Sequence, residues 1–196
     1  LKRIQVLESS INNSIVTLNN FISMTDKDLK GVPQDILDRL YMVSKKPLKY
    51  GIPINIEMYT LCMGYIDNPS IRKKLEQFFF TKYFNNTGRL MEVFCYRDIL
   101  AKNLSYKNYT NYRAKDQGLD NNVKIKKFLT EVLSKTDVRF IKEMQALISI
   151  KKKYCMKHDL SCDGKINSWD LEYYLIKWKK QYGLDDNEIQ KYFYRK

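Results

Sequence analysis

The chain has 196 residues, of which 35 are Lys or Arg and 22 are Asp or Glu, so its formal net charge is +13. Hydrophobic residues at 44% and charged residues at 29% indicate a folded chain that can bury a core rather than a disordered one. Seven Gly and four Pro are too few for a β-sandwich or for the glycine-rich loops of Rossmann and P-loop proteins. No apolar run approaches the ~18 residues of a membrane helix.

The amino-terminal third combines helical and irregular patterns. Apolar residues three or four apart over residues 1–22 predict one long helix. Thr25 and Asp28 have the spacing of a capping box, and Gly31 ends the short turn of helix that follows. Alternating isoleucines allow one short strand near residues 47–57.

The rest of the chain shows helical periodicity with short polar breaks. A helix is expected to begin at Pro69, and Ser168 is expected to cap a late one. The other expected helices cover residues 90–100, 105–112, 125–133, 137–154 and a last segment opened by Asp185. These patterns predict an all-α fold: a single multi-helix lobe of about ten helices over residues 1–196, with at most one short β element near residues 47–57.

Histidine and cysteine usage restricts the chemistry. His158 is the only histidine, so we expect no catalytic centre and no hydrolysis of peptide bonds by this chain alone. The four cysteines are expected to be free thiols. Cys155, His158, Cys162 and Asp163 match no zinc-finger spacing. The chain begins in mid-helix pattern without a Met or a signal peptide, so we expect it to be a piece of a longer protein.

Nucleic-acid binding is an alternative suggested by the positive charge and the 15 tyrosines. Basic residues are, however, spread among most predicted helices, and aromatic residues fall largely at core spacing. The only run of three lysines, Lys151 to Lys153, is expected to be a solvated face. We therefore regard nucleic acid as an unlikely partner.

Calcium binding is suggested by residues 159–170, which overlay the twelve-residue EF-hand loop. Oxygen-bearing side chains occupy its positions 1, 3, 5, 9 and 12: Asp159, Ser161, Asp163, Asn167 and Asp170. Gly164 stands at position 6, where the motif requires a turn. Position 12 is nevertheless Asp rather than Glu, and no second loop is present to pair with this one.

The segment Asp163–Tyr174 resembles the "DG-basic-I-x-x-WD-x-x-YY" stretch of the thimet oligopeptidase and neurolysin family of zinc metallopeptidases. Weaker blocks of the same resemblance occur in the same order along the chain: Leu1–Ser10, Gly31–Leu37, Pro69–Phe79, Arg97–Tyr112 and Leu184–Phe193. The likeness is therefore collinear over essentially all 196 residues. Asp163–Tyr174 is its most specific part.

The resemblance implies an α-helical ellipsoid with a deep channel between two lobes, in an enzyme that cleaves short peptides. Catalysis in that family uses zinc held by an HExxH helix and a downstream Glu. This chain contains no HExxH, so the resemblance implies that zinc belongs to the complete family enzyme and that this chain has no cofactor. The piece would contribute helical scaffold and channel wall.

The resemblance also suggests roles for single residues. Asp170, Tyr173 and Tyr174 become candidates for the substrate channel, and Trp169 joins Asp163 and Gly164 in a structural motif. The loop 159–170 becomes a decoy EF-hand without a metal, whose Gly164 supplies a positive φ. The other interpretation of the late helix is that Trp169 and Tyr173 belong to the core and Asp170 is a first-turn acid.

The first alternative to the peptidase fragment is a naturally truncated, non-catalytic relative that binds peptides or a protein. Calcium binding at residues 159–170 and nucleic-acid binding by the positively charged surface are further alternatives. None of these interpretations involves a membrane. We expect a cytoplasmic location, with a mitochondrial one as the alternative, and the sequence does not indicate an oligomeric state.

Overall fold

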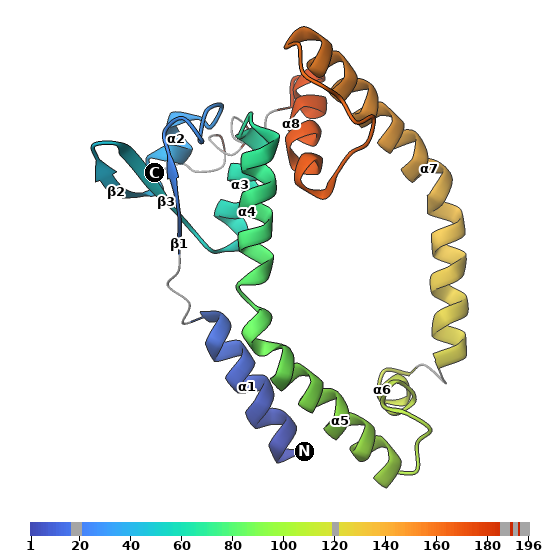
Figure 1. Cartoon of the computed structure of the whole chain (residues 1–196). Helices are drawn as coiled ribbons and strands as arrows, with labels where there is room; N and C mark the ends of the chain where they lie inside the picture. Colours follow the sequence, from blue (N-terminus) through green and yellow to red (C-terminus); the bar gives the residue numbers. More distant parts are fainter. Residues whose placement is uncertain (17–20, 119–121, 185–188, 190–191, 193–196) are drawn as a thin grey trace. The chain divides into compact units, whose positions relative to one another are not determined.

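A computed structural model describes residues 1–16, 21–118, 122–184, 189 and 192. The described residues are mostly helical and include one small antiparallel sheet (Figure 1). They fall into two compact units, each built from two separate stretches of chain. Unit 1 comprises Leu1–Leu18 and Lys82–Ile141, and unit 2 comprises Asn19–Thr81 and Lys142–Lys196. The single lobe expected from the sequence stays a prediction.

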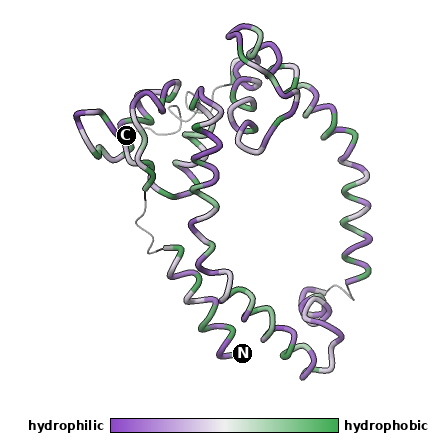
Figure 2. Tube along the Cα trace, in the orientation of Figure 1, coloured by the Kyte–Doolittle hydropathy of each residue, from purple (hydrophilic) through white to green (hydrophobic). Residues whose placement is uncertain are grey.

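Unit 1 is held by the packing of two amphipathic helices, α1 (Lys2–Val16) and α5 (Thr87–Asn103). Hydrophobic positions recur along both helices (Figure 2), and Ile4, Leu7 and Val93 are buried between them. The unit also contains the short η1 (Phe84–Asn86), α6 (Tyr109–Asp116) and the first part of α7 (Asn122–Lys157).

Unit 2 contains a three-stranded sheet in the order β1-β3-β2, so the expectation of at most one short β element was wrong. The strands are β1 (Phe21–Thr25), β2 (Tyr41–Lys45) and β3 (Leu48–Pro53), all antiparallel to their neighbours. Ile22 pairs with Ile52 across β1 and β3, and both are buried. Because Ile22 belongs to this sheet, the helix predicted over residues 1–22 ends at Val16 instead.

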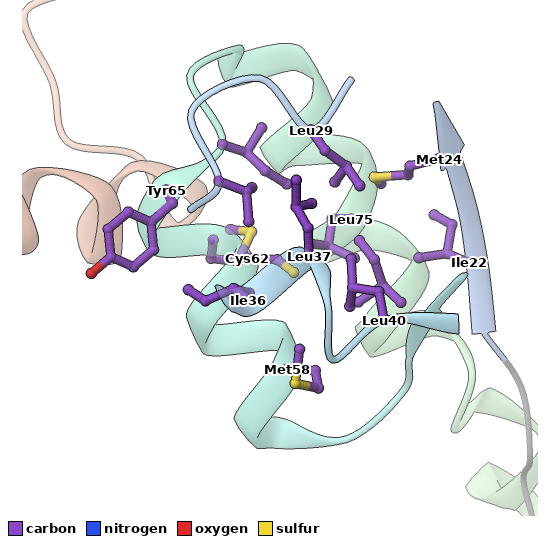
Figure 3. Close-up of a cluster of buried hydrophobic side chains, with 14 residues drawn as sticks. Ile22, Met24, Leu29, Ile36, Leu37, Leu40, Met58, Cys62, Tyr65 and Leu75 are labelled. Atoms are coloured by element: carbon purple, nitrogen blue, oxygen red, sulfur yellow. The ribbon is translucent and has the colours of Figure 1, made fainter. Parts of the chain in front are cut away.

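Helices in the first stretch of unit 2 form its main core together with the sheet, and further helices follow in the second stretch. They are α2 (Gln34–Leu37), α3 (Ile56–Tyr65), α4 (Pro69–Thr81), the last part of α7, η2 (Ser168–Asp170) and α8 (Leu171–Gln181). Figure 3 shows the core side chains meeting between β1 and the helices, with Ile22 and Met24 on the strand and Met58 and Cys62 on α3. Ile66, which follows α3, is fully buried in the same cluster.

Two glycines of unit 2 are needed for close approach. A Cβ at Gly64 would lie 2.3 Å from Cδ1 of Ile176, so a larger residue there would require the Ile176 side chain to shift where α8 packs against α3. Gly31 has φ +97°, and a Cβ there would meet the carbonyl of Tyr65 at 2.4 Å. Gly31 thus ends the turn opened by Thr25 and Asp28, whose reciprocal hydrogen bonds confirm the predicted capping box.

Helix boundaries differ from the prediction at two further places. The two helices predicted over 125–133 and 137–154 are one helix, α7, so the described residues contain fewer helices than the expected ten or so. Ser168 does not cap α8: its hydroxyl donates to Glu76 at 3.0 Å, and a turn of 3₁₀ helix precedes α8. The last helix expected from Asp185 begins outside the described residues. Among the described helices, none combines the length and apolar character needed to cross a membrane.

Candidate functional site

The candidate site surrounds Asp170, at the junction of η2 and α8 in unit 2. Asp170 is 1% exposed, and so is the guanidinium-bearing Arg72 of α4. Lys151, on the carboxyl-terminal part of α7, is 7% exposed. Three elements distant in sequence therefore bring two buried cations and a buried carboxylate together. We call this group, with the exposed Asp163 and the half-buried Asn167 beside it, the Asp170 cluster.

The Lys151 ammonium is surrounded by three oxygens of the loop between α7 and η2. Its Nζ lies 2.7 Å from Oδ1 of Asp163, from the carbonyl oxygen of Lys165 and from Oδ2 of Asp170. Burial alone would lower the pKa of Lys151, but the hydrogen bonds to Asp163 and Asp170 outweigh it and hold the pKa above its usual value. The ammonium is therefore fully charged, and its three donors are all used.

The Arg72 guanidinium makes four hydrogen bonds. Its Nη2 donates to Oδ1 of Asp170 at 2.5 Å, and Nε donates to the carbonyl of Trp169 at 2.9 Å. Nη1 donates to the carbonyls of Ile66 and Asp67 at 2.7 and 3.0 Å. The planar fork of donors thus joins the end of α3, the start of α4 and the start of η2, a geometry that a lysine could not reproduce.

Asp170 accepts from three side chains: Arg72, Lys151 and Asn167, the last at 3.1 Å from Nδ2. Burial by itself raises the pKa of Asp170, but the hydrogen bonds from Lys151, Arg72 and Asn167 prevail and the pKa is lowered. The pKa of Asp163 is also lowered, chiefly by its hydrogen bond from Lys151. Both carboxylates are therefore ionised at neutral pH, and the buried charge is balanced.

Tyr173 and Tyr174, the other channel candidates, pack beside this cluster. Tyr173 is 1% exposed; its hydroxyl donates to Oδ1 of Asp67 at 2.7 Å, and its ring lies 4.1 Å from the Arg72 guanidinium carbon. Tyr174 is 3% exposed and meets the rings of Tyr154 and Tyr173 edge-on. Burial raises the pKa of both hydroxyls. Neither tyrosine is therefore prepared to act as a base.

The EF-hand-like loop already holds a cation. Its positions 5, 7 and 12 are Asp163, the Lys165 carbonyl and Asp170, and these are the oxygens that surround the Lys151 ammonium. Asp159 and Ser161, at positions 1 and 3, are exposed. Gly164 has φ +67°, which confirms the predicted turn. A lysine side chain thus occupies the place that a calcium ion takes in the motif.

A pocket of about 360 Å³ lies against the same cluster. Asp170, Tyr174, Asp163 and Trp169 all contribute to its wall, whereas Tyr173 does not. The structure therefore brings two of the three channel candidates to one pocket and places Tyr173 behind them. A role of these residues in a substrate channel stays a prediction.

Sequence reasoning missed the two cations of the cluster. Lys151 was expected to be solvated with its neighbours, but it is buried while Lys152 and Lys153 are exposed. A signal was available for Lys151, because it follows Leu147 by four residues on the apolar face of α7. Arg72 lay within a block of family resemblance, but nothing local marked it as buried.

Comparison with known proteins identifies the chain. The model of the family described as Peptidase family M3 matches residues 62–195. The chain belongs to peptidase family M3. It is 25% identical to saccharolysin of Saccharomyces cerevisiae over 98% of this chain and 28% of that protein. It is 23% identical to oligopeptidase A of Salmonella typhimurium over 97% of this chain and 29% of that protein.

A third relative is the mitochondrial intermediate peptidase of Lodderomyces elongisporus, 22% identical over 89% of this chain and 23% of that protein. The chain thus spans less than a third of the length of the relatives it matches. The resemblance to the thimet oligopeptidase and neurolysin family is confirmed, and it places this member among metallopeptidases.

Zinc, the metal that the family implies, finds no fitting group of ligands among the described residues. Among the described residues, no three His, Cys, Asp or Glu side chains are grouped so as to hold a metal ion. The only histidine, His158, stacks near Tyr154 with ring centres 4.3 Å apart. Cys155 is buried, and burial together with a neighbouring thiol, Cys162, raises its pKa to about 11.

Proposed function

We propose that this chain provides helical scaffold and part of the substrate-channel wall of an M3-type enzyme that cleaves short peptides, without containing the catalytic centre. The proposal is carried by one observation: the family's most specific block, Asp163–Tyr174, supplies the buried Asp170 that pairs with Arg72 and Lys151 beside a pocket. A wall that positions a peptide must be rigid, and a fully hydrogen-bonded cluster provides rigidity.

Peptide binding at the pocket is tested on this chain by nuclear magnetic resonance. The chain has two tryptophans, Trp169 at the pocket and Trp178 on α8, so their two indole N–H signals form a matched pair. Titration with short peptides should shift the Trp169 signal and leave the Trp178 signal in place. Equal shifts of both signals, or none at millimolar peptide, would contradict a role of this pocket in binding.

The channel role is tested in a family-length protein that contains this chain. Tyr174→Phe keeps the buried ring and removes only the hydroxyl, so peptide turnover should fall while the melting temperature stays unchanged. Tyr182→Phe, at a residue that is 68% exposed, is the matched control. Unchanged turnover in Tyr174→Phe would leave the cluster with a purely architectural role.

The chain alone should not hydrolyse peptides, because it has one histidine and no fitting metal site among the described residues. The assay uses a fluorogenic peptide with repurified chain and added zinc. Turnover that survives repurification and is abolished by a chelator would show that the catalytic centre lies within this chain after all.

A truncated relative that only binds peptides or a protein remains the second candidate function. Sequencing the transcript beyond this segment distinguishes the peptidase from the truncated relative, because codons for an HExxH motif downstream would support the peptidase. A cytoplasmic location remains a prediction, with a mitochondrial one as the alternative.

A further inference from the structure

A second pocket of unit 2 lies apart from the Asp170 cluster, where α3, α4 and the start of α8 meet. Its volume is about 630 Å³, and it shares no lining residue with the first pocket. Large apolar side chains form its surface although they are open to solvent: Ile56 is 67% exposed, Phe80 56% and Leu171 37%. We call this pocket the α3–α4–α8 groove.

The floor of the groove is an ordered aromatic cluster. The Tyr59 ring stacks on Phe79 with centres 4.1 Å apart, and Phe80 meets both rings edge-on. Such packing fixes the faces of the rings before anything binds, which reduces the entropy lost on binding. The groove therefore offers a preformed apolar and aromatic surface.

Two carboxylates stand on the groove, Glu76 from α4 and Glu172 from α8. Glu76 is oriented by the Ser168 hydroxyl, which donates to its Oε2 at 3.0 Å. Both carboxylates line the groove together with Tyr59, whose pKa is raised to about 12 by burial and, after it, by the charges of Glu76 and Glu172. Neither forms an ion pair within the part of the chain that the structure describes.

The charge of the groove is opposite to that of the chain. The chain carries 35 Lys and Arg, yet none of them lines the groove. Elsewhere in unit 2, the exposed Glu57 is paired with Arg39. An apolar surface with two unpaired carboxylates repels phosphates and acidic peptides, and it complements a cation carried on an apolar stem.

We propose that the α3–α4–α8 groove binds a peptide segment in which a Lys or Arg side chain is flanked by apolar residues. The basic head lies between Glu76 and Glu172, its aliphatic stem covers the Tyr59 ring, and a neighbouring apolar side chain packs on Phe80 and Leu171. Specificity comes from the carboxylates and the contact area from the aromatic floor. The site is a recognition surface and needs no catalytic step.

Binding is measured on this chain by calorimetry with three blocked tripeptides: acetyl-Leu-Arg-Phe-amide, the same peptide with norleucine at the centre, and the same peptide with Glu. The Arg peptide should bind with a dissociation constant of ~1 mM or tighter. The norleucine peptide should bind several-fold more weakly, and the Glu peptide should show no binding. Added NaCl should weaken only the Arg peptide.

The double variant Glu76→Gln/Glu172→Gln should weaken the Arg peptide by about fivefold or more, as expected for two lost ion pairs, and bring it to the level of the norleucine peptide. Glu131→Gln, an exposed glutamate on α7 outside the groove, is the matched control and should bind like the wild type. Thermal melts of all variants check that the fold is retained, since Glu76 and Glu172 are half-buried.

Three results would overturn the proposal. The first is equal binding of the Arg and Glu peptides. The second is a shift of the Trp169 indole signal together with an affinity that is unchanged in the double variant, since this would place the peptide in the other pocket. The third is a concentration-dependent dimer lost in the double variant, which makes a second copy the occupant. Because no turnover is measured, any of these outcomes leaves the proposed peptidase function untouched.

Discussion

The ion pairs of unit 1 named here lie at the surface, whereas unit 2 contains both an exposed pair and a buried one. In unit 1, Arg3 pairs with Glu92 at 2.7 Å and Arg97 with Glu8 at 2.7 Å. About a third or more of each of these four side chains is exposed to solvent. In unit 2, Arg72 and Asp170 pair at 2.5 Å with both side chains 1% exposed. The distances are similar, but water competes for the pairs of unit 1, as it does for the exposed Arg39–Glu57 pair of unit 2, and is excluded from Arg72 and Asp170. The lesson is that the environment of a pair, rather than its geometry, decides how much depends on it.

The largest effect is expected for Asp170→Asn, which leaves two buried cations without their shared carboxylate. We expect a loss of about 3–5 kcal/mol in the free energy of unfolding, the usual result of breaking a buried pair from one side. Urea denaturation measures it. Asp98→Asn removes the exposed pair with Lys102 on α5 and should change stability by less than ~0.5 kcal/mol. Similar losses in both variants would erase the distinction between the units.

Lys151→Met should have the next largest effect, about 2–3 kcal/mol, because Asp170 keeps Arg72 and Asn167 while Asp163 turns to water. The same measurement applies, with Lys152→Met at the exposed neighbouring position as control. If both lysine variants behave alike, Lys151 is a surface residue in solution.

Acid should weaken unit 2 through the same carboxylates. The pKa values of Asp163 and Asp170 are lowered in the folded chain, so the stability they contribute is present above the unfolded value of about 4 and is lost as the pH falls below it. Unfolding free energies between pH 7 and pH 3 should fall more steeply for the wild type than for Asp170→Asn. Parallel curves would show that Asp170 does not titrate differently in the two states.

Calcium gives a smaller and more specific test. The wild type should show no change in melting temperature with CaCl₂, because the Lys151 ammonium holds the loop oxygens. In Lys151→Ala those oxygens are released, and 10 mM Ca²⁺ should restore ~1.4 kcal/mol if the site binds at ~1 mM, the weak end for such loops. A wild-type chain that binds calcium through six or more oxygens would refute the internal-cation interpretation.

The smallest effect is expected in unit 1. Glu92→Gln removes the partner of Arg3 on the surface, and the denaturation midpoint should stay within experimental scatter. A loss of unfolding free energy comparable to that of Asp170→Asn would show that the stability of unit 1 also depends on its ion pairs.

Local sequence signals predicted local structure well. The capping box of Thr25 and Asp28, the positive φ of Gly164 and the helix that begins at Pro69 all follow from a few neighbouring residues. The family resemblance, also read from short blocks, was confirmed over most of the chain.

Elements and contacts formed between residues far apart in the sequence could not be predicted from such local patterns. Strand β2 has no buried residue, so its sequence shows no alternation of apolar and polar residues. Ile22 in β1 continues the apolar spacing of α1, and only its pairing with Ile52 in the distant strand β3 shows that it belongs to a sheet. The Asp170 cluster joins Lys151 to a residue 19 positions away and Arg72 to one 98 positions away. A pattern of neighbouring residues cannot reveal a pair whose two members lie 98 positions apart.

The 98-residue separation of Arg72 and Asp170 also sets an order of events during synthesis. At ~5–20 residues per second, the ribosome completes Asp170 roughly 5–20 s after Arg72. Until then, burying the guanidinium would leave its charge without a carboxylate. We therefore expect residues 66–72 to stay hydrated on the nascent chain and unit 2 to close only after its second stretch has left the ribosome.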